Sequence, residues 1–146
     1  YHSVYCGLKA IKGADYVLIH DGARPFLDEE IIKRNIQAVR EYQACVAGMP
    51  VKDTIKISDE EEFAAATPDR SKLWMIQTPQ TFSYALIYEA YEEMLKTEDT
   101  AITDDAMVLE RIKGKKSKLI EGSYRNIKIT TPEDLLIANV YLQHPE

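Results

Sequence analysis

A short apolar run, a helical repeat and a second apolar run follow one another near the start of this chain. Residues 16–20 are apolar and partly β-branched and then meet Asp-Gly, which is typical of a buried strand ending in a loop. Isoleucine and valine recur at helical spacing from Ile31 to Val39, behind Asp28 as a capping residue. Residues 44–50 are again short and apolar. Strand, helix and strand in this order predict a parallel α/β sheet.

The middle of the chain has a different pattern. Residues 51–57 alternate apolar and polar side chains, which is typical of a half-exposed strand, and residues 73–76 form another short apolar run. We expect an arm over residues 50–82 that projects from the sheet. An arm with an exposed apolar face needs a cover, and a second subunit is the usual one.

The last part of the chain returns to an α/β pattern. Ser83 and Thr103 stand where they can cap two helices, and residues 118–120 and 126–129 have the composition of strands. Residues 131–134 (Thr-Pro-Glu-Asp) indicate a helix start, with a capping threonine, a proline at the first position and two acids facing the dipole.

Charge and cysteine content narrow the possible partners. The formal net charge of −6 argues against duplex nucleic acid, because phosphate backbones select basic faces. No apolar run approaches membrane-spanning length, so no membrane partner is expected. Cys6 and Cys45 form no metal-type cluster, and two free thiols in a reducing cytosol are a simpler interpretation than one disulfide.

The loop after the first expected strand carries the first candidate site residues. Asp21 stands at the strand end, where ligands of parallel sheets bind, and its carboxylate can hold Mg²⁺ or another divalent cation. Arg24 can reach a phosphate with its planar guanidinium group. The alternative is a structural loop, in which Asp21 caps a turn and Arg24 pairs with a surface acid. His20 is expected to be structural.

Several other residues have both a functional and a structural interpretation. Lys128 alternates with isoleucines, so it either points into a cavity or guards an edge strand. Arg70 is either an anion ligand or a solvated turn residue. Thr54, Thr78 and Thr103 can each donate a hydroxyl to a substrate, although Thr54 also suits a strand and Thr103 a helix cap. No nucleophile or general base is evident, which fits phosphoryl-type transfer by positioning and positive charge.

Six segments occur in a characteristic order over nearly the whole chain: residues 20–25 (HDGARP), 50–56 (PVKDTIK), 68–70 (PDR), 77–82 (QTPQTF), 103–106 (TDDA) and 126–135 (NIKITTPEDL). Together they resemble the 2-C-methyl-D-erythritol 4-phosphate cytidylyltransferases of the non-mevalonate isoprenoid pathway. None of the segments is decisive alone, but their order and spacing are those of this family.

The resemblance implies a Rossmann-like nucleotidyltransferase sheet and a homodimer formed through the arm. It implies transfer of a cytidylyl group from CTP to a sugar-alcohol phosphate, 2-C-methyl-D-erythritol 4-phosphate, with release of pyrophosphate and a divalent cation such as Mg²⁺. The expected location is the cytoplasm, or the plastid stroma in a plant. The family begins with a strand and a glycine-rich nucleotide loop that residues 1–146 lack. We therefore expect one incomplete nucleotidyltransferase domain, inactive alone.

The resemblance also implies roles at the nucleotide and the attacking phosphate. Asp21 would hold Mg²⁺ and nucleotide, and Arg24 would lie beside it at the substrate. Lys128 and Arg70 would position the attacking phosphate. Ser3 matches the segment that contacts the cytidine nucleotide.

Three threonines would bind the acceptor, namely Thr54, Thr78 and Thr103. Because Thr54 and Arg70 belong to the arm, the resemblance implies that they complete the site of the neighbouring subunit.

Two alternatives stay open. Ribitol-5-phosphate cytidylyltransferases share the chemistry but use another acceptor, and residues 22–23 and 103–106 favour the methylerythritol enzymes. The other alternative is a non-catalytic module that binds a nucleotide or only dimerises. A purely structural domain has no need for Arg24, Arg70 and Lys128 together, which argues against this second alternative.

Overall fold

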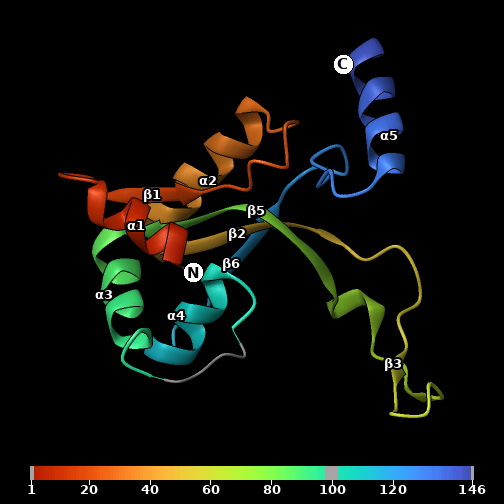
Figure 1. Ribbon diagram of the computed structural model, residues 1–146, viewed down its shortest axis with the longest axis horizontal. Coiled ribbons are helices and arrows are strands. Elements are labelled where there is room, and N and C mark those ends of the chain that lie inside the picture. The colour runs from red at the N-terminus through yellow and green to blue at the C-terminus, as the bar shows by residue number, and fades with distance from the viewer. Residues whose placement is uncertain (1, 98–101, 146) are drawn as a thin grey trace.

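The computed structural model describes residues 2–97 and 102–145, and a four-stranded sheet with helices on both faces forms its centre (Figure 1). A two-stranded sheet lies at one end. In chain order the elements are α1 (His2–Ala10), β1 (Tyr16–Ile19), α2 (Glu29–Tyr42), β2 (Ala44–Pro50), β3 (Ile57–Ser58), β4 (Ala64–Ala66), the 3₁₀ turn η1 (Arg70–Lys72), β5 (Trp74–Ser83), α3 (Tyr84–Met94), α4 (Asp105–Lys113), β6 (Lys118–Glu121) and α5 (Pro132–Gln143).

The central sheet is mixed, with strand order β1-β5-β2-β6. The strands expected before and after the helix of residues 31–39, which is α2, are confirmed as β1 and β2. They run in the same direction. They are not neighbours, because β5 lies between them and is antiparallel to both. Among the described strands, β2 and β6 form the parallel pair. The expected parallel sheet is therefore a mixed sheet in which β5 lies between β1 and β2.

Helices cover both faces of this sheet, α2 on one side and α3 with α4 on the other (Figure 1). The larger core lies under α3 and α4, where Val46 and Phe82 of the sheet pack with Tyr91 and Leu109 of the helices. α1 joins this core through Leu8. Burying one side chain of this size contributes about 1.5–3 kcal/mol, so this layer dominates the packing that holds the strand ends in place.

Two helix starts agree with the capping residues expected from the sequence. Asp28 caps α2, since its side chain accepts a hydrogen bond from the Ile31 amide at 2.8 Å. Thr131 caps α5 through a reciprocal pair of bonds with Asp134, and Pro132 occupies the first helical position.

Two other expected caps differ in the structure. Thr103 does not cap α4. Asp104, one residue later, does so by accepting a hydrogen bond from the Met107 amide at 2.8 Å. Ser83 stands at the capping position of α3, but its side chain makes no capping bond. At α4 the carboxylate next to threonine takes the role, because a charged acceptor binds the first-turn amides more strongly.

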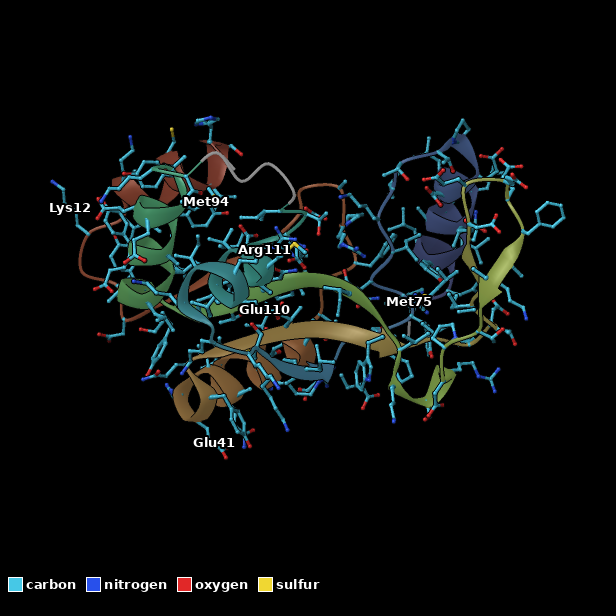
Figure 2. All side chains as sticks on the ribbon, turned by 90° about the horizontal axis from the view of Figure 1, so that it is seen from below. Lys12, Glu41, Met75, Met94, Glu110 and Arg111 are labelled. Carbon is cyan, nitrogen blue, oxygen red and sulfur yellow. The ribbon has the colours of Figure 1, made fainter. Side chains whose placement is uncertain are left out.

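Residues 51–73 leave the sheet as a projecting arm and return (Figure 1). The half-exposed strand expected over residues 51–57 is not formed, apart from Ile57 at the start of β3. The upper limit expected for the arm, residue 82, falls within β5 at the centre of the sheet. Figure 2 shows Met75 where β5 passes from the sheet to the arm.

The last helix, α5, is apolar and weakly packed. Leu136 and Leu142 are 68% and 69% exposed, and Ala138 is the buried residue of this helix. Both figures place α5 and the arm at the end of the molecule away from α3. Within residues 2–97 and 102–145, no helix combines the length and apolarity that crossing a membrane requires.

Candidate functional site

A polar cleft of about 240 Å³ opens at the edge of the sheet where β1 and β6 end. Its walls come from the loop after β1, from β5, from the start of α4 and from the segment after β6. The lining residues are Asp21, Arg24, Ile76, Gln77, Thr78, Gln80, Thr103, Asp104, Asp105 and Lys128. The structure thus brings together five of the residues expected at the site, namely Asp21, Arg24, Thr78, Thr103 and Lys128.

Asp21 is the centre of charge in this cleft. Its Oδ2 atom lies 3.0 Å from Lys128 Nζ and 3.4 Å from Arg24 Nε. Burial opposes ionisation of this carboxyl, but Lys128 and Arg24 outweigh it, so the pKa of Asp21 lies below its ordinary value. Among residues 2–97 and 102–145, none bonds to the other oxygen, Oδ1. Asp21 is therefore an ionised carboxylate that two cationic side chains contact through the same oxygen.

The loop that carries Asp21 is fixed by hydrogen bonds to β5. The Asp21 amide donates to Thr78 Oγ1 at 3.0 Å, and this hydroxyl lies 2.9 Å from His20 Nδ1. His20 Nε2 lies 2.9 Å from the carbonyl oxygen of Arg24. Because a carbonyl only accepts, we assign a ring hydrogen to Nε2, and the Thr78 hydroxyl lies within hydrogen-bond distance of Nδ1. The structural interpretation of His20 is confirmed.

Arg24 joins this loop to the segment that follows β6. Its Nη1 donates to the Asn126 carbonyl at 2.7 Å, and the Ile129 amide donates to the Ala23 carbonyl at 2.8 Å. The strand expected over residues 126–129 is not formed, because these residues bond to the loop instead of to a strand ladder. The segment directs Lys128 into the cleft, so Lys128 does not guard a strand edge.

The two acids at the start of α4 have structural bonds and also line the cleft. Asp104 caps the helix and accepts from Gln80 Nε2 at 3.0 Å, while Gln80 Oε1 accepts from the Ala106 amide at 2.9 Å. Asp105 accepts a hydrogen bond from the Tyr91 hydroxyl. Burial raises the pKa of Asp105, and Asp104 adds to this effect.

Sequence reasoning missed Gln80 and Asn126, which organise the site from within the protein. Gln80 is 2% exposed and Asn126 is fully buried. In the sequence, the one indication of their role is their residue type, because a buried amide side chain must find hydrogen-bond partners. Which partners it finds depends on the tertiary fold.

Three expected site residues lie outside the cleft. Thr54 and Arg70 are exposed on the arm, where Arg70 Nη1 donates to the Lys52 carbonyl at 2.8 Å. Ser3 is exposed on α1. Within a single chain these residues do not join Asp21, so the structure by itself assigns them no common site.

Both cysteines are free, as expected. Cys6 is exposed and Cys45 is buried, and burial raises the pKa of the Cys45 thiol to about 12. In the part of the chain that the structure describes, no group of three or more His, Cys, Asp or Glu side chains is arranged to hold a metal ion.

Helices cover both faces of the mixed sheet, and at its strand ends the side chains of Lys128 and Arg24 contact the ionised carboxylate of Asp21. These features define an α/β fold of the nucleotidyltransferase type. Such a site suits a phosphorylated ligand. The chain belongs to the IspD family, 2-C-methyl-D-erythritol 4-phosphate cytidylyltransferase, whose model matches residues 1–144.

Similar proteins carry the same name. The enzyme of this name from Alkaliphilus oremlandii is 54% identical over 142 residues, which are 97% of this chain and 59% of that protein. The one from Lachnospira eligens is 50% identical over 144 residues, with shares of 98% and 63%. The chain thus spans about 60% of the length of these curated relatives.

Solved structures of the same family share the fold. The 4-diphosphocytidyl-2C-methyl-D-erythritol synthase of Anaerococcus prevotii is 43% identical with a TM-score of 0.91, covering 97% of this chain and 63% of that one. The 2-C-methyl-D-erythritol 4-phosphate cytidylyltransferase of Thermus thermophilus is 33% identical with a TM-score of 0.82, covering 97% and 68%. The expected α/β nucleotidyltransferase fold is therefore confirmed, and dimerisation through the arm stays a prediction.

Proposed function

We propose that this protein is a cytidylyltransferase that transfers a cytidylyl group from CTP to 2-C-methyl-D-erythritol 4-phosphate and releases pyrophosphate. The observation that carries the proposal is the convergence of Lys128 and Arg24 on Asp21 in the strand-end cleft. Membership of the IspD family supports the choice of donor and acceptor.

The proposed reaction needs positioning and charge more than proton transfer. An oxygen of the acceptor phosphate attacks the α-phosphorus of CTP and forms a new P–O bond. The bond from that phosphorus to the oxygen bridging to the β-phosphorus breaks, and its electron pair leaves with pyrophosphate. Lys128 and Arg24 supply positive charge for the phosphates, which in reactions of this type provides most of the catalysis. The acceptor phosphate is already ionised at neutral pH, so no general base is required.

Asp21 is the residue that would hold a divalent cation such as Mg²⁺. Its carboxylate is ionised, and its Oδ1 atom has no partner among the described residues. Mg²⁺ is commonly bound by one or two carboxylates together with phosphate oxygens of the substrate, so this donor set fits. When bound, the cation would neutralise charge on the triphosphate and on the leaving pyrophosphate.

The remaining site residues would contact the substrates, some of them from a neighbouring subunit of a homodimer. We propose that Thr54 and Arg70, exposed on the arm, complete the cleft of a neighbouring subunit. Within one chain, Thr78 and Thr103 line the cleft and would face the acceptor. Ser3 on α1 would contact the nucleotide. What supports these roles is exposure or position together with the family pattern.

The direct test is a pyrophosphate-release assay with CTP, Mg²⁺ and 2-C-methyl-D-erythritol 4-phosphate. It compares this 146-residue chain with the same chain preceded by whatever sequence its gene places upstream. Because the chain spans about 60% of the length of its curated relatives, we expect release from the longer protein. Release from neither would contradict the proposed reaction, and calorimetry with CTP and Mg²⁺ would then identify a module that only binds nucleotide.

Ribitol 5-phosphate is the comparison acceptor in the same assay. The two acceptors differ in length and branching, and small pocket differences of this kind change specificity by roughly 10- to 200-fold. We expect faster release with the methylerythritol phosphate. Equal or better use of ribitol phosphate would overturn the acceptor assignment while leaving cytidylyl transfer intact.

The cytoplasmic location and the lack of a nucleic-acid partner also stay predictions. The two free cysteines and the net charge of −6 support them. Fractionation of the source cells and a gel-shift assay with duplex DNA would test each directly.

A further inference from the structure

Asn126 is fully buried next to the cleft without lining it. Its Nδ2 atom donates to the Thr78 carbonyl at 2.8 Å and lies 3.3 Å from Gln77 Oε1. Its own backbone carbonyl accepts from Arg24 Nη1 at 2.7 Å. One residue therefore bonds to the central strand with its side chain and to the loop after β1 with its backbone.

The position of Asn126 fixes both cationic side chains of the cleft, Arg24 and Lys128. Arg24 is held directly, because one end of its guanidinium group binds the Asn126 carbonyl while Nε reaches Asp21. Lys128 is held through the chain, since it lies between Asn126 and Ile129, whose amide binds the Ala23 carbonyl at 2.8 Å. The segment is thus anchored on both sides of the lysine that pairs with Asp21.

We propose that Asn126 is a positioning residue that holds Arg24 and Lys128 in register so that both converge on Oδ2 of Asp21. The consequence for catalysis rests on the proposed function. The arrangement of the three charges does not, and it can be measured without any substrate.

A purely structural role for Asn126 makes a different prediction, and Asn35 offers the matched comparison. Asn35 is a second fully buried asparagine whose side chain is hydrogen-bonded. Its Nδ2 donates to the Ile31 carbonyl at 2.8 Å, and its Oδ1 accepts from the Thr81 hydroxyl at 2.7 Å. It lies on α2 and does not line the cleft. If Asn126 contributes only to the stability of the protein, replacing Asn126 or Asn35 should have similar effects on the charged residues of the cleft.

The test compares crystal structures of the 146-residue chain, in the wild type and in Asn126→Leu and Asn35→Leu. In the wild type and in Asn35→Leu we expect Lys128 Nζ and Arg24 Nε to stay 3.0 Å and 3.4 Å from Asp21 Oδ2. In Asn126→Leu at least one of these distances should exceed the ion-pair limit of about 4 Å, because Arg24 and Lys128 are no longer held beside the carboxylate. Unchanged distances in Asn126→Leu, or an equal displacement in Asn35→Leu, would overturn the proposal.

A milder variant covers the possibility that Asn126→Leu does not fold, which circular dichroism would reveal. Asn126→Ser keeps a hydroxyl donor, but this donor lies one bond closer to the main chain and so further from the Thr78 carbonyl. We expect a smaller displacement of Arg24 and Lys128 from Asp21 in the same direction. Wild-type distances in a folded Asn126→Ser protein would contradict the proposal when Asn126→Leu gives no data.

Kinetics give the second readout. In the catalytically active protein, Asn126→Leu should lower kcat/KM for the acceptor by up to about 100-fold, while Asn35→Leu with a comparable loss of stability should leave it nearly unchanged. If the wild type shows no cytidylyl transfer, the proposed function fails, and the distances to Asp21 in the variant structures still decide whether Asn126 positions Arg24 and Lys128. Equal losses in the two variants would point to stability alone and refute the positioning role.

Discussion

Two aspartates in the same cleft have pKa values that move in opposite directions. Burial opposes ionisation of both, but at Asp21 the nearby Lys128 and Arg24 outweigh it, whereas at Asp105 burial dominates. The pKa of Asp21 is therefore lowered and that of Asp105 raised. Opposite shifts of neighbouring carboxyls are common where a site needs one fixed charge, and here the fixed charge is on Asp21.

The raised pKa of Asp105 predicts how stability varies with pH. A carboxyl whose pKa is higher in the folded state than in the unfolded state stabilises the protein fully below about pH 3.9 and loses that contribution as pH rises through the folded value. We therefore expect Asp105→Asn to gain unfolding free energy relative to the wild type as pH rises from about 4 towards 7. Urea unfolding at several pH values measures this difference.

Asp134 provides a control with the opposite sign. Hydrogen bonds from the Thr130 and Thr131 amides lower the pKa of its carboxyl, so its stabilising contribution is present above the unfolded pKa and is lost as pH falls through the folded value. Relative to the wild type, Asp134→Asn should lose stability as pH rises. The same slope for both variants would show that the two carboxyls do not titrate as described.

Sequence reasoning identified the charged residues of the cleft but not the polar residues that orient them. Asp21 and Arg24 could be found because a charged loop after an apolar run stands out, and Lys128 because it interrupts isoleucines. Gln80 and Asn126 could not be found in this way. Their hydrogen bonds span 24 to 102 positions along the chain or run through backbone atoms, so no local pattern reveals them.

At the scale of elements, the sequence did not predict that β5 is an inner strand, paired with β1 on one side and β2 on the other. Residues 77–81 (Gln-Thr-Pro-Gln-Thr) are polar, and proline normally argues against a strand in the middle of a sheet. The structure tolerates Pro79 because the pairing of β5 with β2 is irregular between Val46 and Gly48. The apolar run before it, residues 73–76, was visible from the sequence, but the continuation into the sheet was not.

Gln80 ties α4 to this strand, which leads to a prediction about local stability. Gln80→Leu removes the bonds to Asp104 and to the Ala106 amide and leaves that buried amide without a partner, at a cost of about 1–3 kcal/mol. Hydrogen exchange at Ala106 should accelerate more than exchange in α2. Thermal unfolding gives the total loss of stability.

The control for this variant is Gln37→Leu, since Gln37 lies on the outer side of α2, away from the cleft. A surface change of this kind should alter stability by less than about 0.5 kcal/mol. If the Ala106 amide exchanges at the wild-type rate in Gln80→Leu, the link between β5 and the start of α4 does not hold the helix as described.

At the scale of the whole molecule, the most exposed large apolar side chains of the described residues lie on the arm and on α5. Phe63 on the arm is 68% exposed, and the leucines of α5 lie at the same end of the molecule (Figure 1). The sequence predicted an arm and a partner for it. It did not predict that α5 would be exposed on most sides, because capping and composition alone do not show which neighbours a helix finds.

The proposed homodimer can be tested through Phe63. Phe63→Asp places a charge on the apolar surface of the arm, so we expect the protein to sediment as a monomer, whereas the wild type sediments as a dimer. Glu60→Ala on the same arm should leave the mass unchanged. A wild type that sediments as a monomer at all concentrations would contradict the proposed homodimer, and a Phe63→Asp dimer would place the contact elsewhere.

The alternation of side chains along β5 has a consequence for how this fold can diversify. Gln80 and Phe82 face α3 and α4, while Thr81 faces α2 and bonds to Asn35. Inserting or deleting one residue in β5 would exchange these two faces and separate the cleft loops from their anchors. The exposed tip between β3 and β4 carries no such restriction. Relatives should therefore differ in length at the arm tip and keep the length of β5 unchanged, a pattern that an alignment of the family would reveal.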